Sequence, residues 1–319
     1  MSLRMARQLD GRDYVLHAWL TFGGTWSVPG TGYCSWVIGA ASATGLVYEV
    51  PVQGPYTFGP VGGSPTAPSY AQSVDAAVEW AIAWILTHPL QTFGIGGYSM
   101  GGEAASRVLA EILTPGGRCY HLRHNFIGGF ALGNPSRQEG HGIGPGGVVP
   151  DGQGISQFHL TDTPENWVDY CNRFNGVWDF YTRVPMNMAK VAEAAYTLGI
   201  ELQLNDPIKC AVDLVENLIK LLQVAGVDLP FPNLGAILSG AFIGLLRGLG
   251  VKLGAAGDNE TAAAIECAIL ALQFVTSNPP TAPHIRYEFD EVEPGVTYLE
   301  HARRHVVTCC HAVPARTAA

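Results

Sequence analysis

The chain has 319 residues, which is enough to bury the core of one large domain or two modest ones. Charged residues make up 14% of the sequence and 39 residues are glycine, a composition typical of a compact, loop-rich protein and not of a disordered chain. The formal net charge is −9 and no run of lysine or arginine occurs, which argues against nucleic acid as a partner.

Seven cysteines are scattered along the chain without a C-x-x-C pair, so zinc-ribbon and thioredoxin-like sites are not expected. An odd number of cysteines cannot pair completely within one chain, and one or two disulfides remain open. Residues 1–13 contain no apolar stretch of the kind found in signal peptides, so we expect synthesis without a leader.

The first part of the chain alternates between strand and helix patterns. Apolar and β-branched residues predict strands over 14–22, 46–52, 92–98, 125–132 and 167–172, and helical spacing predicts helices over 69–87 and 101–113. Ser69 is the expected N-cap of the first of these helices. Strands separated by helices indicate a parallel sheet with helices on both faces.

The pattern changes after residue 184. Helical stretches over 185–198, 207–225, 234–253 and 260–276 are separated by glycine and proline, without a strand pattern. We therefore expect a core at 14–184, a helical insertion or cap at 185–278, and a return to the core at 279–307. A last helix is expected at 298–307, followed by a flexible tail at 308–319.

One stretch of the insertion, residues 234–251, is almost continuously apolar. A membrane-spanning helix needs about 20 such residues, but Arg247 and several glycines interrupt this one. We expect a buried packing helix or a surface that meets an apolar substrate, and no transmembrane anchor.

Residues 97–101 read Gly-Tyr-Ser-Met-Gly, a G-x-S-x-G motif between a predicted strand and a predicted helix. A serine on such a sharp turn needs small residues two positions away on either side, because the backbone leaves no room for a Cβ there. This context predicts that Ser99 is the nucleophile of an α/β-hydrolase. The alternative is a glycine-rich turn that holds a serine without a catalytic role.

Two backbone N–H groups are expected to bind the oxyanion that forms when this serine attacks a carbonyl. The N–H of Met100 is the first, at the positive end of the following helix. The second is expected from the loop Gly23-Gly24-Thr25 after an early strand, from either Gly24 or Thr25. A plain turn at the end of the strand is the alternative for this loop.

A catalytic serine also needs a base, and the base needs an acid that fixes its tautomer. In α/β-hydrolases the acid precedes the histidine in the chain. Asp179 fits best, because Asn175-Gly176 opens a loop after the strand at 167–172. Asp162, in a polar turn, and Asp169, within the strand itself, are the alternatives.

Four histidines follow this aspartate: His284, His301, His305 and His311. His284 follows a proline-rich loop that suits a catalytic position, so it is the expected base. His301 and His305 have the i,i+4 spacing of metal ligands, but no third ligand is evident and we expect a solvated helix face. His311 falls in the expected tail, and no metal or organic cofactor is implied.

Several motifs resemble those of cutinases. Gly-Tyr-Ser-Met-Gly-Gly at 97–102 resembles the Gly-Tyr-Ser-Gln-Gly of that family, with Met100 in the place of the glutamine. The run Asp-Tyr-Cys-Asn at 169–172, leading to Asp179, resembles the cutinase segment that carries the acid.

The motifs are also similar to those of the lysin B family of mycobacteriophages, which are cutinase-like esterases. Gly-Asn-Pro-Ser-Arg-Gln at 133–138 resembles a Gly-Asn-Pro-Met-Arg-Gln signature of that family. Trp-Asp-Phe-Tyr at 178–181 and Ala-Pro-His at 282–284 resemble the segments that carry its acid and its histidine.

The resemblance implies a cutinase-like α/β-hydrolase fold, with a helical insertion before the catalytic histidine. It implies a lipid ester substrate and agrees with the acid and the histidine selected above. With the residue patterns, it predicts a triad of Ser99, Asp179 and His284 and oxyanion donors at Met100 and Thr25. The implied reaction is hydrolysis of the ester that joins mycolic acid to arabinogalactan during phage-induced lysis of the host.

The same resemblance implies synthesis in the host cytoplasm and action on the host cell envelope, either after release at lysis or from the virion. Two alternatives remain. One is a general cutinase-like or lipase-like carboxylesterase or a mycolate acyltransferase, and the other is a phage structural or binding protein with a degenerate hydrolase fold.

Overall fold

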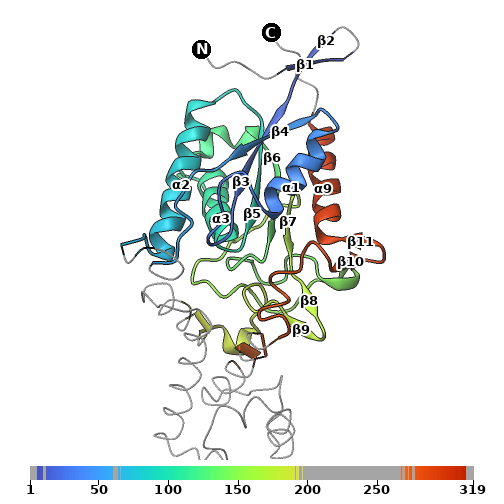
Figure 1. Cartoon of the computed structure of the whole chain (residues 1–319). Helices are drawn as coiled ribbons and strands as arrows, with labels where there is room; N and C mark the ends of the chain where they lie inside the picture. Colours follow the sequence, from blue (N-terminus) through green and yellow to red (C-terminus); the bar gives the residue numbers. More distant parts are fainter. Residues whose placement is uncertain are drawn as a thin grey trace, which may run out of the picture.

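The computed structural model describes residues 6–9, 12–59, 64, 66–190, 192–193, 196, 267, 270–271, 273–274 and 277–313, with the backbone alone at 6–9 and 12–15. Its centre is a parallel sheet of five strands in the order β4-β3-β5-β6-β7 (Figure 1). The strands are β3 (His17–Phe22), β4 (Val47–Pro51), β5 (Phe93–Tyr98), β6 (Phe126–Leu132) and β7 (Trp167–Tyr170). The predicted parallel sheet is confirmed.

Helices cover both faces of this sheet. The helices α2 (Tyr70–Thr87) and α3 (Met100–Leu113) pack on one face, and α1 (Tyr33–Ser42) and α9 (Tyr298–Ala312) pack on the other (Figure 1). Side chains of β3 alternate between the two cores: Leu20 packs with α2 and α3, and Trp19 packs with α1 and α9. This layered arrangement is the predicted α/β-hydrolase fold.

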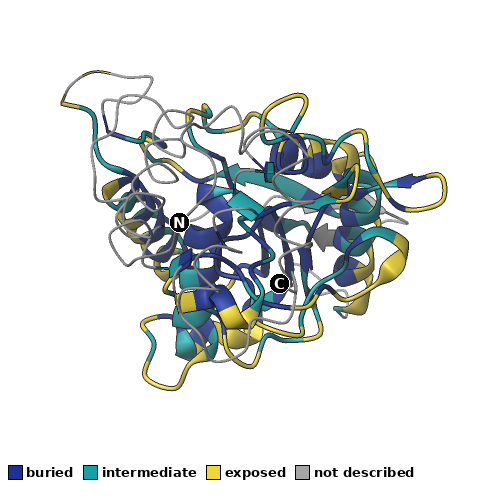
Figure 2. Cartoon of the chain, turned by 90° about the horizontal axis from the view of Figure 1, so that it is seen from below, coloured by how far each residue is buried: buried dark blue, intermediate teal, exposed yellow. Residues whose placement is uncertain are grey.

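The buried residues lie along the sheet and the inner faces of the helices, and exposed loops surround them (Figure 2). The helix α2 begins where the sequence predicts. The Ser69 side chain accepts a hydrogen bond from the N–H of Gln72, and the Gln72 side chain accepts one from the N–H of Ser69. This reciprocal capping box satisfies donors that a helix start leaves unpaired.

Two expectations about element boundaries were wrong, and one helix was not predicted. The strand expected at 14–22 is two strands, because β2 (Arg12–Val15) pairs antiparallel with β1 (Ala6–Leu9), whereas β3 joins the main sheet. The helix α1 was not predicted, because a glycine at its N-cap provides no side-chain cap. The last helix continues beyond 307 to Ala312, since Cys309 and Cys310 follow its spacing into the core, so the tail does not begin at 308.

Most of the expected insertion at 185–278, with its apolar stretch at 234–251, lies outside the described residues. Its described part begins with a short turn of helix, η3 (Met186–Met188), and includes Tyr196 and Phe274, which are buried against the core. None of the described helices combines the length and the hydropathy of a transmembrane span.

Several short elements complete the described part of the chain. Two residues in the left-handed region, Asn175 and Gly176, connect β8 (Arg173–Phe174) to β9 (Val177–Trp178), as a tight hairpin requires. The remaining elements are η1 (Tyr120–Asn125), η2 (Pro145–Gly147), β10 (Glu291–Glu293) and β11 (Val296–Thr297). The β8–β9 hairpin ends immediately before Asp179 and so positions that carboxylate.

Candidate active site

Ser99 lies on the turn between β5 and α3 in a strained backbone conformation, with φ 55° and ψ −121°. The glycines on either side make this turn possible. A Cβ on Gly97 would lie 2.8 Å from the Cα of Gly102, and one on Gly101 would collide with the carbonyls of Phe22 and Gly23. The glycine requirement inferred from the motif therefore has a specific cause, which is backbone packed directly against both positions.

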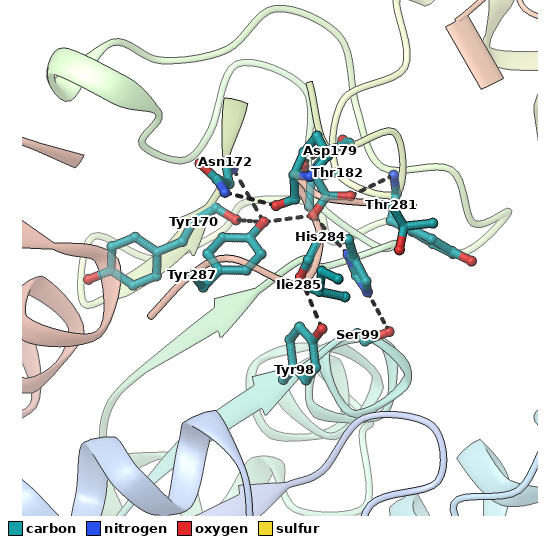
Figure 3. Close-up of polar contacts among 12 residues, drawn as sticks. Tyr98, Ser99, Tyr170, Asn172, Asp179, Thr182, Thr281, His284, Ile285 and Tyr287 are labelled. Carbon is teal, nitrogen blue, oxygen red and sulfur yellow. Dashed lines mark hydrogen bonds and ion pairs between the residues drawn. The ribbon is translucent and has the colours of Figure 1, made fainter. Parts of the chain in front are cut away.

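His284 reaches this serine from a loop 185 residues further along the chain. Its Nε2 lies 2.9 Å from the Ser99 Oγ, and its Nδ1 lies 2.9 Å from the Asp179 Oδ2 (Figure 3). The structure thus brings together the three side chains that the sequence analysis singled out as nucleophile, base and acid. The imidazole bridges the hydroxyl and the carboxylate.

The carboxylate of Asp179 is fully buried and accepts hydrogen bonds from several donors. Besides His284, the backbone N–H of Tyr181 lies 3.1 Å from Oδ1, and the hydroxyl of Tyr287 lies 2.7 Å from Oδ2. A buried charge is tolerated when such donors replace water. The set holds the carboxylate in one orientation toward the imidazole.

The imidazole ring is enclosed by its neighbours. Tyr98 stacks on it with ring centroids 5.2 Å apart, and the ring of Tyr181 lies 4.6 Å away. The Tyr98 hydroxyl donates to the backbone carbonyl of His284 at 3.0 Å, and burial raises the pKa of this phenol well above its usual value. Gly133, with φ 62°, lies against the ring, where a Cβ would come within 2.6 Å of the His284 Cε1. The position of the ring therefore depends on its packing as well as on its hydrogen bonds.

The motif at 133–138 organises the loops around the site. Arg137 is fully buried, and its guanidinium donates to backbone carbonyls, among them those of Thr182 at 2.7 Å, His141 at 2.6 Å and Gly152 at 2.7 Å. Thr182 belongs to the loop that carries Asp179. Arg137 thus ties the loop after β6 to the loop that holds the acid.

The two alternative acids occupy other environments. Asp162 is exposed in a turn with φ 54°. Asp169 is buried in β7, and its carboxylate accepts from the Asn134 side chain at 2.7 Å and lies 3.3 Å from the His141 Nδ1. Of the three candidate acids, Asp179 is the one whose carboxylate contacts His284.

The expected oxyanion donors lie near the serine. Met100 is the first residue of α3, so its N–H has no acceptor within the helix. Gly24 is packed against the turn, since a Cβ there would lie 3.5 Å from the Ser99 Cβ, and Thr25 is the next residue. The loop after β3 therefore passes the nucleophile, and the donor role of Thr25 stays a prediction.

The solvated helix face expected for His301 and His305 was wrong. His301 Nδ1 lies 2.9 Å from the Tyr170 hydroxyl, and His305 Nε2 donates to the carbonyls of Gly129 at 2.9 Å and Asn166 at 3.2 Å. Both rings face the sheet because α9 packs on it, and burial lowers the pKa of each. Within the described ranges, no group of three or more potential ligands could hold a metal ion.

Sequence reasoning did not find Tyr287, although its hydroxyl contacts the buried carboxylate of Asp179. Its three-residue distance from His284 could have suggested proximity to the site, but nothing in the sequence indicates its partner. Several described cysteines are buried thiols that form no disulfide: Cys34, Cys119, Cys171, Cys309 and Cys310. Cys210 lies outside the described residues.

No protein-family model and no curated protein matches the chain. Among solved structures, it is similar to lysin B from mycobacteriophage D29, with 17% identity over 91% of this chain and 98% of that one, and a TM-score of 0.47. It is also similar to a cutinase-like protein from Cryptococcus sp. (17% identity, 62% of this chain and 94% of that one, TM-score 0.40). A third is the catalytic core domain of acetyl xylan esterase from Trichoderma reesei (17% identity, 60% and 96%, TM-score 0.42).

Proposed function

We propose that this protein is a serine esterase that uses Ser99 as nucleophile, His284 as base and Asp179 as acid. The observation that carries the proposal is the continuous chain of contacts from Asp179 through His284 to Ser99, with 2.9 Å at each step. A serine held at φ 55° between a strand and a helix is the second supporting observation, because strained backbone concentrates at functional sites.

In the proposed reaction, the Ser99 Oγ attacks the carbonyl carbon of an ester while the His284 Nε2 takes the hydroxyl proton. The buried carboxylate of Asp179 stabilises the imidazolium that forms and holds its Nδ1–H. The tetrahedral intermediate expels the alcohol, which receives the proton from Nε2. Water then attacks the acyl carbon while Nε2 takes its proton, and the second tetrahedral intermediate collapses as Nε2 returns this proton to the Ser99 Oγ, which frees the acid.

Negative charge develops on the carbonyl oxygen during both steps, and we assign its stabilisation to the N–H groups of Met100 and Thr25. Loss of one such donor typically costs about 2.7–4 kcal/mol of transition-state stabilisation. Met100 contributes through its backbone, so a side chain other than the glutamine of cutinases is compatible with this role.

For the substrate, we propose the ester between mycolic acid and arabinogalactan in the mycobacterial envelope, cleaved during phage-induced lysis. The support is the resemblance of the segments at 133–138, 178–181 and 282–284 to the lysin B family. The protein would then act on the host envelope after its synthesis in the host cytoplasm, either released at lysis or carried by the virion.

The experiment that tests this function compares the wild type with Ser99→Ala, His284→Ala and the control Ser42→Ala, whose serine is exposed on α1. We expect wild type and the control to hydrolyse p-nitrophenyl butyrate and to release free mycolic acid from purified mycolyl-arabinogalactan, and both site variants to do neither.

Activity on the soluble ester alone would favour a general cutinase-like or lipase-like esterase. Transfer of mycolate to a sugar acceptor in place of water would favour an acyltransferase. Inactivity of the wild type on both substrates would refute the enzymatic proposal and favour a binding protein with a degenerate hydrolase fold.

A further inference from the structure

Tyr287 is a fully buried phenol at the acid end of the triad (Figure 3). Its hydroxyl oxygen lies 2.7 Å from the Asp179 Oδ2, which is also the oxygen that contacts the His284 Nδ1. The same hydroxyl accepts the N–H of Asn172 at 3.3 Å and lies 3.1 Å from the carbonyl oxygen of Tyr170. The neighbours of this hydroxyl are therefore one hydrogen-bond donor and two acceptors, all of them groups of the protein.

A phenol has one hydrogen to donate, and two acceptors compete for it here. The carboxylate is the nearer of the two and carries charge, and charge-assisted hydrogen bonds are shorter and stronger than neutral ones. Burial and the neighbouring Asp179 raise the pKa of Tyr287 well above its usual value, so the proton stays on the phenol. The hydroxyl is thus a permanent donor to Oδ2.

We propose that Tyr287 is a positioning residue of the active site, which orients Asp179 and sets the pH at which His284 can act as a base. This inference rests on the proposed function. The hydroxyl withdraws negative charge from the oxygen that faces the imidazole, and it holds the carboxylate in the orientation that the imidazole requires.

Removal of the hydroxyl changes both properties in known directions. A carboxylate with one donor fewer presents more negative charge to the imidazole and stabilises its protonated form more strongly. The protonated imidazole cannot accept the proton of Ser99. As the pH falls, the variant should therefore lose activity at a higher pH than the wild type does. The carboxylate also keeps fewer restraints, which lowers the turnover rate.

Other ionisable groups near this pair do not supply the same effect. The groups that touch the imidazole, the Asp179 carboxylate or the Tyr287 ring are Ser99, Tyr98, Tyr181, Tyr33 and Tyr298. Cys171 and Arg137 lie beside the loop that carries Asp179. Burial raises the pKa of Tyr98 well above its usual value and that of Cys171 to about 12, so both stay neutral in the range where the enzyme is assayed. The guanidinium of Arg137 donates to backbone carbonyls, so the charged group in contact with the imidazole is the Asp179 carboxylate.

The experiment measures kcat/KM for p-nitrophenyl butyrate between pH 5 and 9 in the wild type, Tyr287→Phe and Tyr298→Phe. Active sites are counted with a fluorophosphonate probe, so that misfolded protein does not enter the rates. Tyr298→Phe is the matched control, because Tyr298 is equally buried, packs against Tyr287 with ring centroids 5.2 Å apart, and donates to the carbonyl of Cys171 at 3.2 Å.

For Tyr287→Phe, we expect the acid limb of the profile to move to higher pH by about half a unit to one unit. We also expect kcat per labelled site to fall about tenfold. The profile of Tyr298→Phe should superimpose on that of the wild type, since its hydroxyl does not contact the triad.

In a second measurement, a ring-fluorinated tyrosine replaces Tyr287. It keeps the hydroxyl group and makes it a stronger hydrogen-bond donor. The acid limb should then move in the opposite direction, to lower pH. Superimposable acid limbs in all these proteins would overturn the inference while leaving the proposed function standing. A wild-type protein that neither hydrolyses the ester nor reacts with the probe would refute both.

Discussion

Gly133 offers a direct test of how closely the histidine is held, because the position combines a left-handed backbone with contact against the imidazole. Its φ is 62°, and a Cβ there would lie 2.6 Å from the Cε1 and 2.8 Å from the Nδ1 of His284. Ordinary Cβ contacts begin at 3.4 Å, so Gly133→Ala requires the ring to move by about 0.8 Å. The ring cannot move without lengthening its contacts with Ser99 and Asp179.

A misplacement of about 1 Å in a catalytic group can cost on the order of a hundredfold in rate. We therefore expect Gly133→Ala to lower kcat for p-nitrophenyl butyrate about a hundredfold, which corresponds to about 2.7 kcal/mol in the activation free energy. The left-handed backbone adds a loss of about 1–2 kcal/mol in the free energy of unfolding, measured by urea denaturation.

The control is Gly140→Ala, at a glycine with φ 70° and no heavy atom within 4 Å of the added Cβ. It should lose about 1–2 kcal/mol in the free energy of unfolding through its left-handed backbone alone and keep the kcat of the wild type. A wild-type kcat in Gly133→Ala, or an equal loss of activity in Gly140→Ala, would contradict the expected displacement of the ring.

Three further predictions concern stability. Arg137→Met should lower the free energy of unfolding by about 3 kcal/mol or more in urea titrations, because it leaves buried carbonyls without a donor, and a loss below 1 kcal/mol would contradict this. Burial lowers the pKa of His305 below its usual 6.5 in the folded protein. The unfolded chain therefore binds more protons below about pH 6.5, and the free energy of unfolding should decrease as the pH falls below this value. His305→Gln, which keeps a donor for Gly129, should lose less between pH 7 and 5, and an unchanged pH dependence would argue against this origin. Ser69→Ala should lower the melting temperature through a loss of about 1 kcal/mol at the start of α2, whereas Ser64→Ala, outside the capping box, should not.

The sheet and its nearest helices could be predicted because their patterns are local. The apolar runs that form β5 and β6 are continuous, as strands buried on both faces require, and α2 carries its start in the Ser69 cap. The helix α1 could not be found in the same way, because Gly32 leaves its start without a side-chain cap.

The residues of the candidate site differ in the same way: some have a local sequence pattern, and others are recognised by contacts that are distant in the sequence. Ser99 stands out because its strand, helix and glycines lie within a few residues of each other. Asp179 and His284 were selected by chain order and loop context, and their contact spans 105 residues. The hydrogen bond from Tyr287 to Asp179 spans 108 residues and has no local pattern, so only the folded chain reveals it. His305 was misjudged for a related reason, because its carbonyl partners lie on the sheet, far away in the sequence.

The central claim is that the contacts of His284 and Asp179 make Ser99 a nucleophile. The most direct measurement treats the wild type, Ser99→Ala and His284→Ala with a fluorophosphonate and locates the adduct by peptide mass spectrometry. We expect one adduct per wild-type chain, on Ser99, with no labelling of Ser99→Ala and very slow labelling of His284→Ala. A wild-type chain that stays unmodified, or a Ser99→Ala chain that is labelled equally well, would contradict it.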